Sequence, residues 1–126
     1  MELNIDYDST VNDVQVQFNA LYPFLQLQFL KSGLEENKNI YRKTKAIPEL
    51  SIKKLRLTHN PVSVSIENAV TVAELLKNFR KIGLLAQVCR KSANLWVEAS
   101  LTDDWTLERQ NREAMLLSMP TEKPIS

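Results

Sequence analysis

The chain has 126 residues, of which 44% are hydrophobic and 25% are charged, and its formal net charge is only +1. This length is enough to enclose one hydrophobic core, and the composition is that of a globular protein rather than of a disordered tail or a polycation. The single cysteine, Cys89, excludes an internal disulfide and a cysteine-rich zinc site, and it favours a reducing, cytoplasmic location. The acidic start and the lack of a long apolar run predict neither a secretory signal nor a membrane span.

The first 33 residues predict a strand, a helix and a second strand. Leu3, Ile5 and Tyr7 alternate with polar residues, as in a half-buried strand. Thr10 caps a helix that Pro23 ends. The apolar residues of that helix recur every three or four positions, at Val11, Val14, Phe18 and Leu21. Alternation over residues 25–29 then predicts a strand that stops near Gly33.

The next segment, residues 33–50, is polar and has no clear period. It is therefore expected to be a long loop that holds, at most, a short strand around Ile40 and Tyr41. Pro48 is expected to begin a short helix through Ser51 to Leu57.

The same pattern returns in the second half of the chain. Residues 62–67 alternate as a strand does, and Thr71 and Glu74 form a T-x-x-E capping box ahead of a helix that stops at Gly83. Residues 84–89 and 95–99 alternate on either side of a turn at 92–94, which predicts a hairpin. Capping residues at 102–104 predict a last helix through Leu117, and residues 120–126 are expected to be a flexible tail.

The two halves resemble each other at a constant offset of 61 residues. The matched pairs are Leu3 with Val64, Ile5 with Ile66, Thr10 with Thr71, Asp13 with Glu74, Phe18 with Phe79, and Leu27 with Val88. This predicts pseudo-repeats over 3–32 and 64–92 within a single α+β domain, residues 1–119. Two such units are expected to share one sheet in a ferredoxin-like arrangement of duplicated βαβ units, with an added hairpin strand and a C-terminal helix.

An offset of 60 instead matches Lys31-Ser32 with Lys91-Ser92. A slip of one residue turns every side chain of a strand to the opposite face, so the two offsets predict different surfaces. The offset of 61 is preferred because it keeps Leu27 and Val88 on the same inward face.

That register leaves a polar open face with one aromatic ring, Trp96, on an edge strand. The face comprises Asn4, Asp6, Gln26, Gln28, Ser63, Ser65, Glu67, Gln87, Cys89, Lys91, Trp96 and Glu98. Related folds bind single-stranded RNA through aromatic rings on central strands, and here the central strands carry none. Tryptophan is often an interface anchor. Trp96 with Arg90 and Lys91 is therefore the candidate partner-binding site, while Trp105 is expected to hold the last helix on the sheet.

Positive charge is concentrated in residues 38–91, which hold twelve basic residues and three acidic ones. Clustered cations can bind a phosphate backbone or an acidic partner. The candidate nucleic-acid-binding residues are Lys43, Lys45, Lys53, Lys54 and Arg56. A solvated surface, with Lys77, Arg80 and Lys81 on the outer side of a helix, is the alternative.

No motif for catalysis, metal binding or phosphate binding is recognisable. His59 and Cys89 are the only residues that resemble a base and a nucleophile, and neither stands in a known catalytic frame. Asp103, Asp104 and Glu108 suit helix capping better than a metal site. We expect no cofactor and no metal.

The C-terminal half carries the stretch Val88-Cys89-Arg90-Lys91-Ser92-Ala93-Asn94-Leu95-Trp96-Val97-Glu98, followed by Thr102-Asp103-Asp104-Trp105-Thr106-Leu107 and Gln110-Asn111. These motifs resemble a family of small uncharacterised bacterial proteins. That family commonly has an aromatic residue at position 89 and glycine at position 93. The resemblance implies one folded unit and carries no activity or catalytic residue with it.

These observations favour a noncatalytic protein-interaction or adaptor module that binds another protein through a sheet edge or the Trp96 face. A nucleic-acid-binding protein that uses residues 38–91 is the alternative. An enzyme that uses His59 or Cys89 is a third reading. The hairpin edge is also a candidate surface for homo-oligomerisation.

Overall fold

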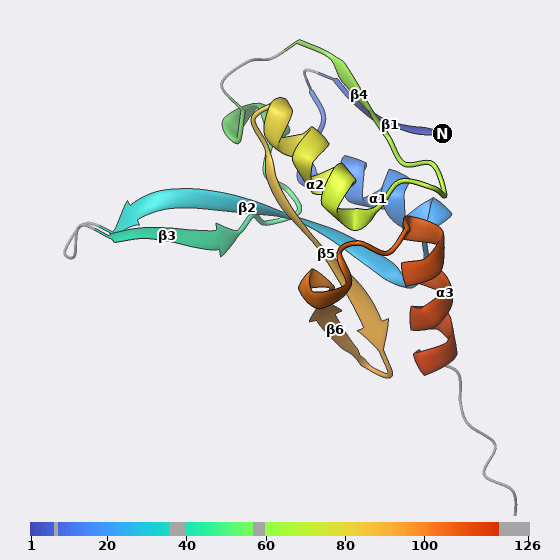
Figure 1. Cartoon of the computed structure of the whole chain (residues 1–126). Coiled ribbons are helices and arrows are strands. Elements are labelled where there is room, and N and C mark those ends of the chain that lie inside the picture. The colour runs from blue at the N-terminus through green and yellow to red at the C-terminus, as the bar shows by residue number, and fades with distance from the viewer. Residues whose placement is uncertain (7, 36–39, 57–59, 119–126) are drawn as a thin grey trace, which may run out of the picture.

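The computed structural model describes residues 1–6, 8–35, 40–56 and 60–118 (Figure 1). The elements are β1 (Glu2–Ile5), α1 (Val11–Leu21), β2 (Leu25–Glu35), β3 (Ile40–Lys45), the 3₁₀ turn η1 (Ile52–Lys54), β4 (Val62–Ser65), α2 (Val72–Lys81), β5 (Leu85–Ser92), β6 (Leu95–Glu98), the 3₁₀ turn η2 (Ser100–Thr102) and α3 (Leu107–Ser118). The α+β class predicted from the sequence is confirmed by these three helices and two antiparallel sheets.

The strands form two sheets where one was predicted. β1 pairs with β4, while β3, β2, β5 and β6 form a second, four-stranded sheet in that order. A ferredoxin-like arrangement would place β1, β2, β4 and β5 in one sheet, so the strand pairing observed here differs from it. Two of the helices contact a strand of both sheets, α1 packing on β1 and β2 and α2 on β4 and β5. Both helices lie between the sheets and cover the same side of the larger one (Figure 1).

In each sheet, one directly opposite pair of residues lies 61 positions apart in the sequence. Leu3 pairs directly with Val64 and Leu27 directly with Val88, and these are the residues that the offset equates. All four are buried in one core between the sheets and the helices. Phe29 of β2 and Phe79 of α2 meet edge to face in that core, with ring centroids 5.3 Å apart. Leu27 and Val88 are thus both on the buried face, as the alternation in the sequence predicted, and the offset of the repeat stays a prediction.

The helix starts differ in how completely they are capped. The Thr10 hydroxyl accepts a hydrogen bond from Asp13 N–H, and the Asp13 carboxylate accepts one from Thr10 N–H, which completes a capping box. At the second helix Thr71 accepts from Glu74 N–H at 3.1 Å, but no bond returns from Glu74. The box predicted at Thr71 and Glu74 is therefore half formed, while the first helix carries a complete one.

The segment predicted as a long loop contains the strand expected around Ile40 and Tyr41, but that strand, β3, is longer than predicted and pairs with an extended β2. β2 continues to Glu35, and β3 returns over Ile40–Lys45 with Lys45 opposite Leu30. This hairpin extends beyond β5, whose pairing with β2 ends at Leu30 (Figure 1). Its outer part is not covered by a helix, so it does not require the apolar alternation that identifies a half-buried strand. The short helix predicted after Pro48 is only the 3₁₀ turn η1.

The last helix starts later than the predicted caps at 102–104. Those residues lie in and after η2, and the Thr106 hydroxyl caps α3 by accepting from Arg109 N–H. α3 is held against the large sheet at both ends. Asn111 accepts a hydrogen bond from Phe24 N–H at 2.9 Å, and the Ser118 hydroxyl donates to Lys91 C=O at 3.2 Å.

Candidate protein-interaction surface

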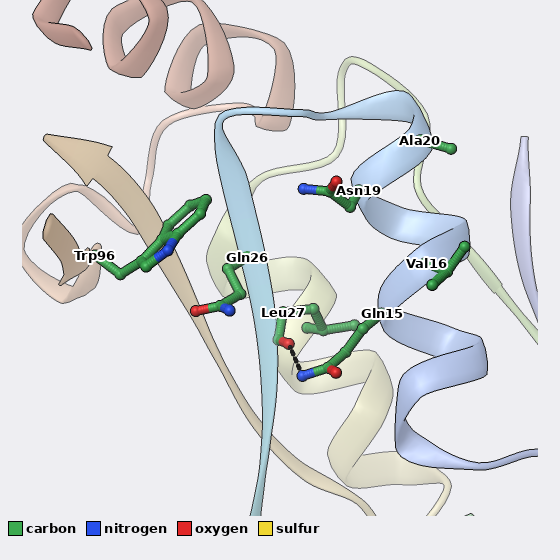
Figure 2. Close-up of a pocket in the computed structure, with 7 residues that line it drawn as sticks. All are labelled: Gln15, Val16, Asn19, Ala20, Gln26, Leu27 and Trp96. Carbon is green, nitrogen blue, oxygen red and sulfur yellow. Dashed lines mark hydrogen bonds between the residues drawn. The ribbon is translucent and has the colours of Figure 1, made fainter. Parts of the chain in front are cut away.

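Trp96 and Lys91 lie side by side on the open face of the large sheet. They are opposite one another in the β5–β6 hairpin, and neither forms the ladder bonds of that hairpin, so their side chains are close. The Trp96 indole extends across β5 toward Gln26 of β2, and it lies over the sheet rather than across its edge (Figure 2). The open face thus carries the aromatic ring that the sequence placed there.

Arg90 lies on the other face of the sheet, with the buried residues. Its guanidinium carbon is 5.9 Å from the ring centre of Trp105, and that of Arg109 is 4.0 Å from the same ring. Trp105, just ahead of α3, is thereby held between β5 and the helix, as expected for a residue that attaches α3 to the sheet. Of the three candidate partner-binding residues, the fold brings Trp96 and Lys91 together and separates Arg90 from them.

A groove of about 430 Å³ separates α1 from the free edge of β2 (Figure 2). It is lined by Gln15, Val16, Asn19, Ala20, Gln26, Leu27 and Trp96. The Gln15 side-chain amide donates to Leu27 C=O at 2.9 Å, and the Asn19 amide donates to Leu25 C=O at 3.1 Å. These helix side chains occupy the carbonyls that a neighbouring strand would otherwise bond.

The edge of β1 is closed in the same way. The Gln17 side chain accepts a hydrogen bond from Asn4 N–H at 2.8 Å and donates one to Asn4 C=O at 3.0 Å. This side-chain amide therefore forms the two hydrogen bonds that a neighbouring strand would form with Asn4. Side-chain amides of α1 thus cover an edge of each sheet. This arrangement hinders the addition of a foreign strand at those two edges.

The edge of β6 is different, because large apolar side chains are exposed along it. The exposed fractions are 70% for Leu95, 41% for Trp96, 42% for Val97 and, in the following turn, 97% for Leu101. Within the part of the chain that the structure describes, no strand is bonded to the outer side of β6. We name this feature, residues Leu95–Glu98 with their free edge, the β6 edge.

Away from Trp96, the open face is occupied by a chain of glutamines. Gln87 donates its amide hydrogen to Gln28 at 2.6 Å, and Gln28 donates to Gln26 at 2.8 Å. The three side chains therefore satisfy much of each other's hydrogen bonding, and they leave no aromatic platform on β2 or β5 for stacking bases.

The two residues considered for catalysis do not form a described site. Cys89 is a free, buried cysteine between Gln26 and Glu98. Burial raises the pKa of its thiol, Lys45 acts to lower that pKa, and the charge of Glu98 acts to raise it further. A raised pKa disfavours the reactive thiolate. His59 lies outside the described residues.

The candidate nucleic-acid-binding residues are placed in different environments. Arg56 is only 7% exposed, and its guanidinium donates to Ile82 C=O at 2.8 Å and to Asn60 C=O at 3.0 Å. Lys54 and Lys31 line a recess of about 180 Å³ beside Gly83. Lys53 is in η1, and Lys43 and Lys45 are on β3. Arg56 therefore donates hydrogen bonds to backbone carbonyls inside the fold, whereas the lysines are distributed over η1 and the β2–β3 hairpin.

Among the described residues, no group of histidine, cysteine and carboxylate side chains could hold a metal ion. No helix in that part of the chain is both long and apolar enough to cross a bilayer. The chain matches no family model, no curated protein and no solved structure. The candidate site can therefore be interpreted only from its own geometry.

Sequence reasoning identified Trp96 but not the apolar residues around it as a surface. Leu95 and Val97 were assigned to the inward-facing pattern of a strand, yet both are exposed because β6 is at the end of the sheet. The position of β6 in the hairpin was the available signal, since the second strand of a terminal hairpin has only one neighbour.

Proposed function

We propose that this protein is a noncatalytic protein-interaction or adaptor module, and that it recognises its partner through the β6 edge. The observation that carries the proposal is an uncovered sheet edge with three successive exposed apolar residues, Leu95, Trp96 and Val97. Sheet edges in soluble proteins are normally blunted by charge, proline or covering side chains. α1 supplies such covers to β1 and β2, and β6 has none among the described residues.

Energetics support recognition at this edge. Full burial of a leucine or valine side chain is worth about 1.5–3 kcal/mol, so an exposed pair of them represents unused burial energy. An added strand would also bond the free backbone groups of β6. Trp96 would supply the large side chain typical of interface hot spots, with Lys91 beside it as the adjacent charge.

The test is to recover a complex from native cells with four baits: wild type, Trp96→Ala, Lys91→Glu and the control Lys77→Glu. Lys77 is an exposed lysine on α2, so its reversal changes the charge as Lys91→Glu does but leaves β6 intact. We expect a partner of defined stoichiometry with wild type and Lys77→Glu, and its loss with Trp96→Ala and Lys91→Glu. If every complex survives both β6 variants, the recognition surface is elsewhere.

The nucleic-acid alternative is favoured by one observation, the recess lined by Lys31 and Lys54, with Lys53 next to it in η1. Such binding would weaken steeply as salt concentration rises, because cations on phosphates release counterions. Fluorescence anisotropy with single-stranded and duplex oligonucleotides tests this. Binding at low salt that is lost in Lys53→Glu/Lys54→Glu but kept in Lys91→Glu would favour it, and no binding at low salt would remove it.

We also infer that the two halves are copies of one unit, and that the module acts in the reducing cytoplasm. The pairing of Leu3 with Val64 and of Leu27 with Val88 supports the duplication. So do the isolated bridges, in which each capping threonine pairs with a residue just ahead of a helical segment, Thr10 with Ser51 ahead of η1 and Thr71 with Thr106 ahead of α3. The buried free thiol of Cys89 accords with a reducing compartment.

A further inference from the structure

The hydrogen-bonding pattern of the β5–β6 hairpin determines which atoms face outward at the β6 edge. Ala99 N–H donates to Val88 C=O, so Ala99, Val97 and Leu95 direct their backbone groups toward β5. In an antiparallel pair the intervening residues direct theirs the other way. The N–H and C=O groups of Trp96 and Glu98 therefore point away from the sheet, toward a strand that could be added.

The other strand edges are less suited to addition. The Gln17 amide covers β1 at Asn4, and the amides of Gln15 and Asn19 cover β2. β4 presents the small polar residues Ser63 and Ser65 at its outer edge. Among the strands whose side chains the structure describes, β6 combines outward backbone groups with exposed large apolar side chains, and the edges of β1, β2 and β4 do not.

We propose that the β6 edge pairs antiparallel with the β6 edge of a second copy of this chain, about a twofold axis at Trp96, and joins two four-stranded sheets into one of eight strands. This inference rests on the proposed function, since it names the partner of the same edge. Trp96 of each copy would exchange two backbone hydrogen bonds with Trp96 of the other. Leu95 of each copy would lie opposite Val97 of the other.

The side chains of β6 match themselves in this register. A continuous sheet keeps its faces, so only residues of the same face can be opposite one another, and the axis must pass through Trp96 or through Val97. An axis at Trp96 places the Trp96 backbones opposite one another and packs Leu95 against Val97 on the face away from the indoles. An axis at Val97 would place Trp96 opposite the Glu98 carboxylate. An aliphatic cross-strand pair stabilises a sheet, which favours the axis at Trp96.

The indole position allows this contact. Because the ring extends over β5 toward Gln26, it leaves the backbone of the β6 edge accessible (Figure 2). Charge does not oppose the pairing either, because Glu98 would lie opposite Asn94 and not opposite a second Glu98. A contact over so short a strand buries little area, and small interfaces give weak, transient association. We therefore expect a dimer in concentration-dependent exchange with the monomer.

Sedimentation velocity over a wide range of protein concentration tests the proposal on the full chain. Trp96→Ala removes a ring that extends over β5 and away from the added strand, so it is expected to change the dissociation constant by less than about threefold. Trp96→Pro also removes an N–H that the hairpin does not use, and it is expected to abolish the dimer. Val97→Lys should abolish it as well, while Leu101→Lys, an equal change in a more exposed residue outside β6, should leave the constant within about twofold.

The register is tested by cross-linking in a Cys89→Ala background. Leu95→Cys/Val97→Cys should give a disulfide-linked dimer under mild oxidation, because opposite residues that share no ladder bonds have close side chains. A dimer linked efficiently by Val97→Cys alone would overturn the axis at Trp96. Circular dichroism of each variant verifies that the fold persists.

Two outcomes separate this inference from the proposed function. A chain that stays monomeric at every concentration, and still loses its cellular partner on Trp96→Ala, overturns the second copy and supports the module. A dimer that is indifferent to Trp96→Pro and Val97→Lys overturns the pairing of two copies at the β6 edge, whereas only a cellular partner that is retained by Trp96→Ala and Lys91→Glu overturns the proposed function.

Discussion

Tyr22 offers the sharpest test of how the two halves are held together. Its ring is buried at the end of α1, and its hydroxyl donates to Ile66 C=O at 2.6 Å and contacts Asn68 Oδ1 at 3.0 Å. Tyr22→Phe keeps the ring and removes both contacts, leaving a buried carbonyl without this donor. We expect it to lower the free energy of unfolding by about 2 kcal/mol at neutral pH.

The same residue predicts a dependence on alkaline pH. Burial, and then the negative charges of Glu108 and Glu67, raise the pKa of Tyr22 from 10.0 to about 12. Between these values the unfolded chain releases the phenol proton while the folded chain retains it, so stability falls as pH rises through this window. At about 1.4 kcal/mol per pKa unit, the contribution of Tyr22 should fall by about 1.4 kcal/mol between pH 9 and pH 11.

Urea unfolding of wild type and Tyr22→Phe at intervals from pH 7 to 11, followed by circular dichroism, measures this contribution. Subtracting the two free energies of unfolding removes the contribution of lysines and other titrating groups that both proteins share. We expect that difference to be constant up to pH 9 and then to shrink. A difference that stays level through pH 11 would refute the reasoning, because the phenol would then titrate alike in both states.

Three further predictions concern local features. Ala93→Gly should raise the free energy of unfolding by about 0.5–1 kcal/mol in urea titrations, because Ala93 has φ of 54°, which alanine adopts at a cost and glycine does not; a loss of stability would contradict this. Asp13→Ala should lower the free energy of unfolding by about 1 kcal/mol, and Glu74→Ala by less than half of that in the same measurement, because of the two only Asp13 accepts a hydrogen bond from the backbone of its capping threonine. Equal losses would show that this hydrogen bond does not stabilise the helix. The Cys89 thiol should react with a disulfide reagent at pH 8 roughly tenfold or more slowly in the native chain than in urea, since it is buried with a raised pKa; equal rates would place it at the surface.

The local elements could be predicted because their signals are local. Helices and strands bury one face, so the spacing of Val11, Val14 and Phe18, and of Leu25, Leu27 and Phe29, reflects their periods. The burial of Leu27 and Val88 was also accessible, because each stands at an inward position of an alternating segment.

The division into two sheets could not be predicted in that way. Nothing in the alternation of Leu3 and Ile5 states whether β1 bonds to β2 or to β4, because strand partners are selected by the whole assembly. The length of the β2–β3 hairpin was underestimated for a related reason, since its outer part extends beyond β5 and its sequence carries no apolar period.

The roles of single polar residues were the least predictable part of the site. Arg56 resembled a surface cation within a basic segment, but its guanidinium binds two carbonyls inside the fold. Gln15, Gln17 and Asn19 occupy helix positions that normally face water, and they cover strand edges instead. Such functions depend on which backbone groups lie nearby, and sequence spacing contains no information about that.

The pairing of Leu3 with Val64 and of Leu27 with Val88 has a consequence for how this chain reaches its native state. Both central pairings must close a loop of some sixty residues, and proteins dominated by such distant contacts fold slowly. During synthesis, the first two strands therefore emerge long before their partners leave the ribosome. A chain cut between the halves would yield two pieces that are each unable to complete a sheet, and that could regain structure only by finding each other.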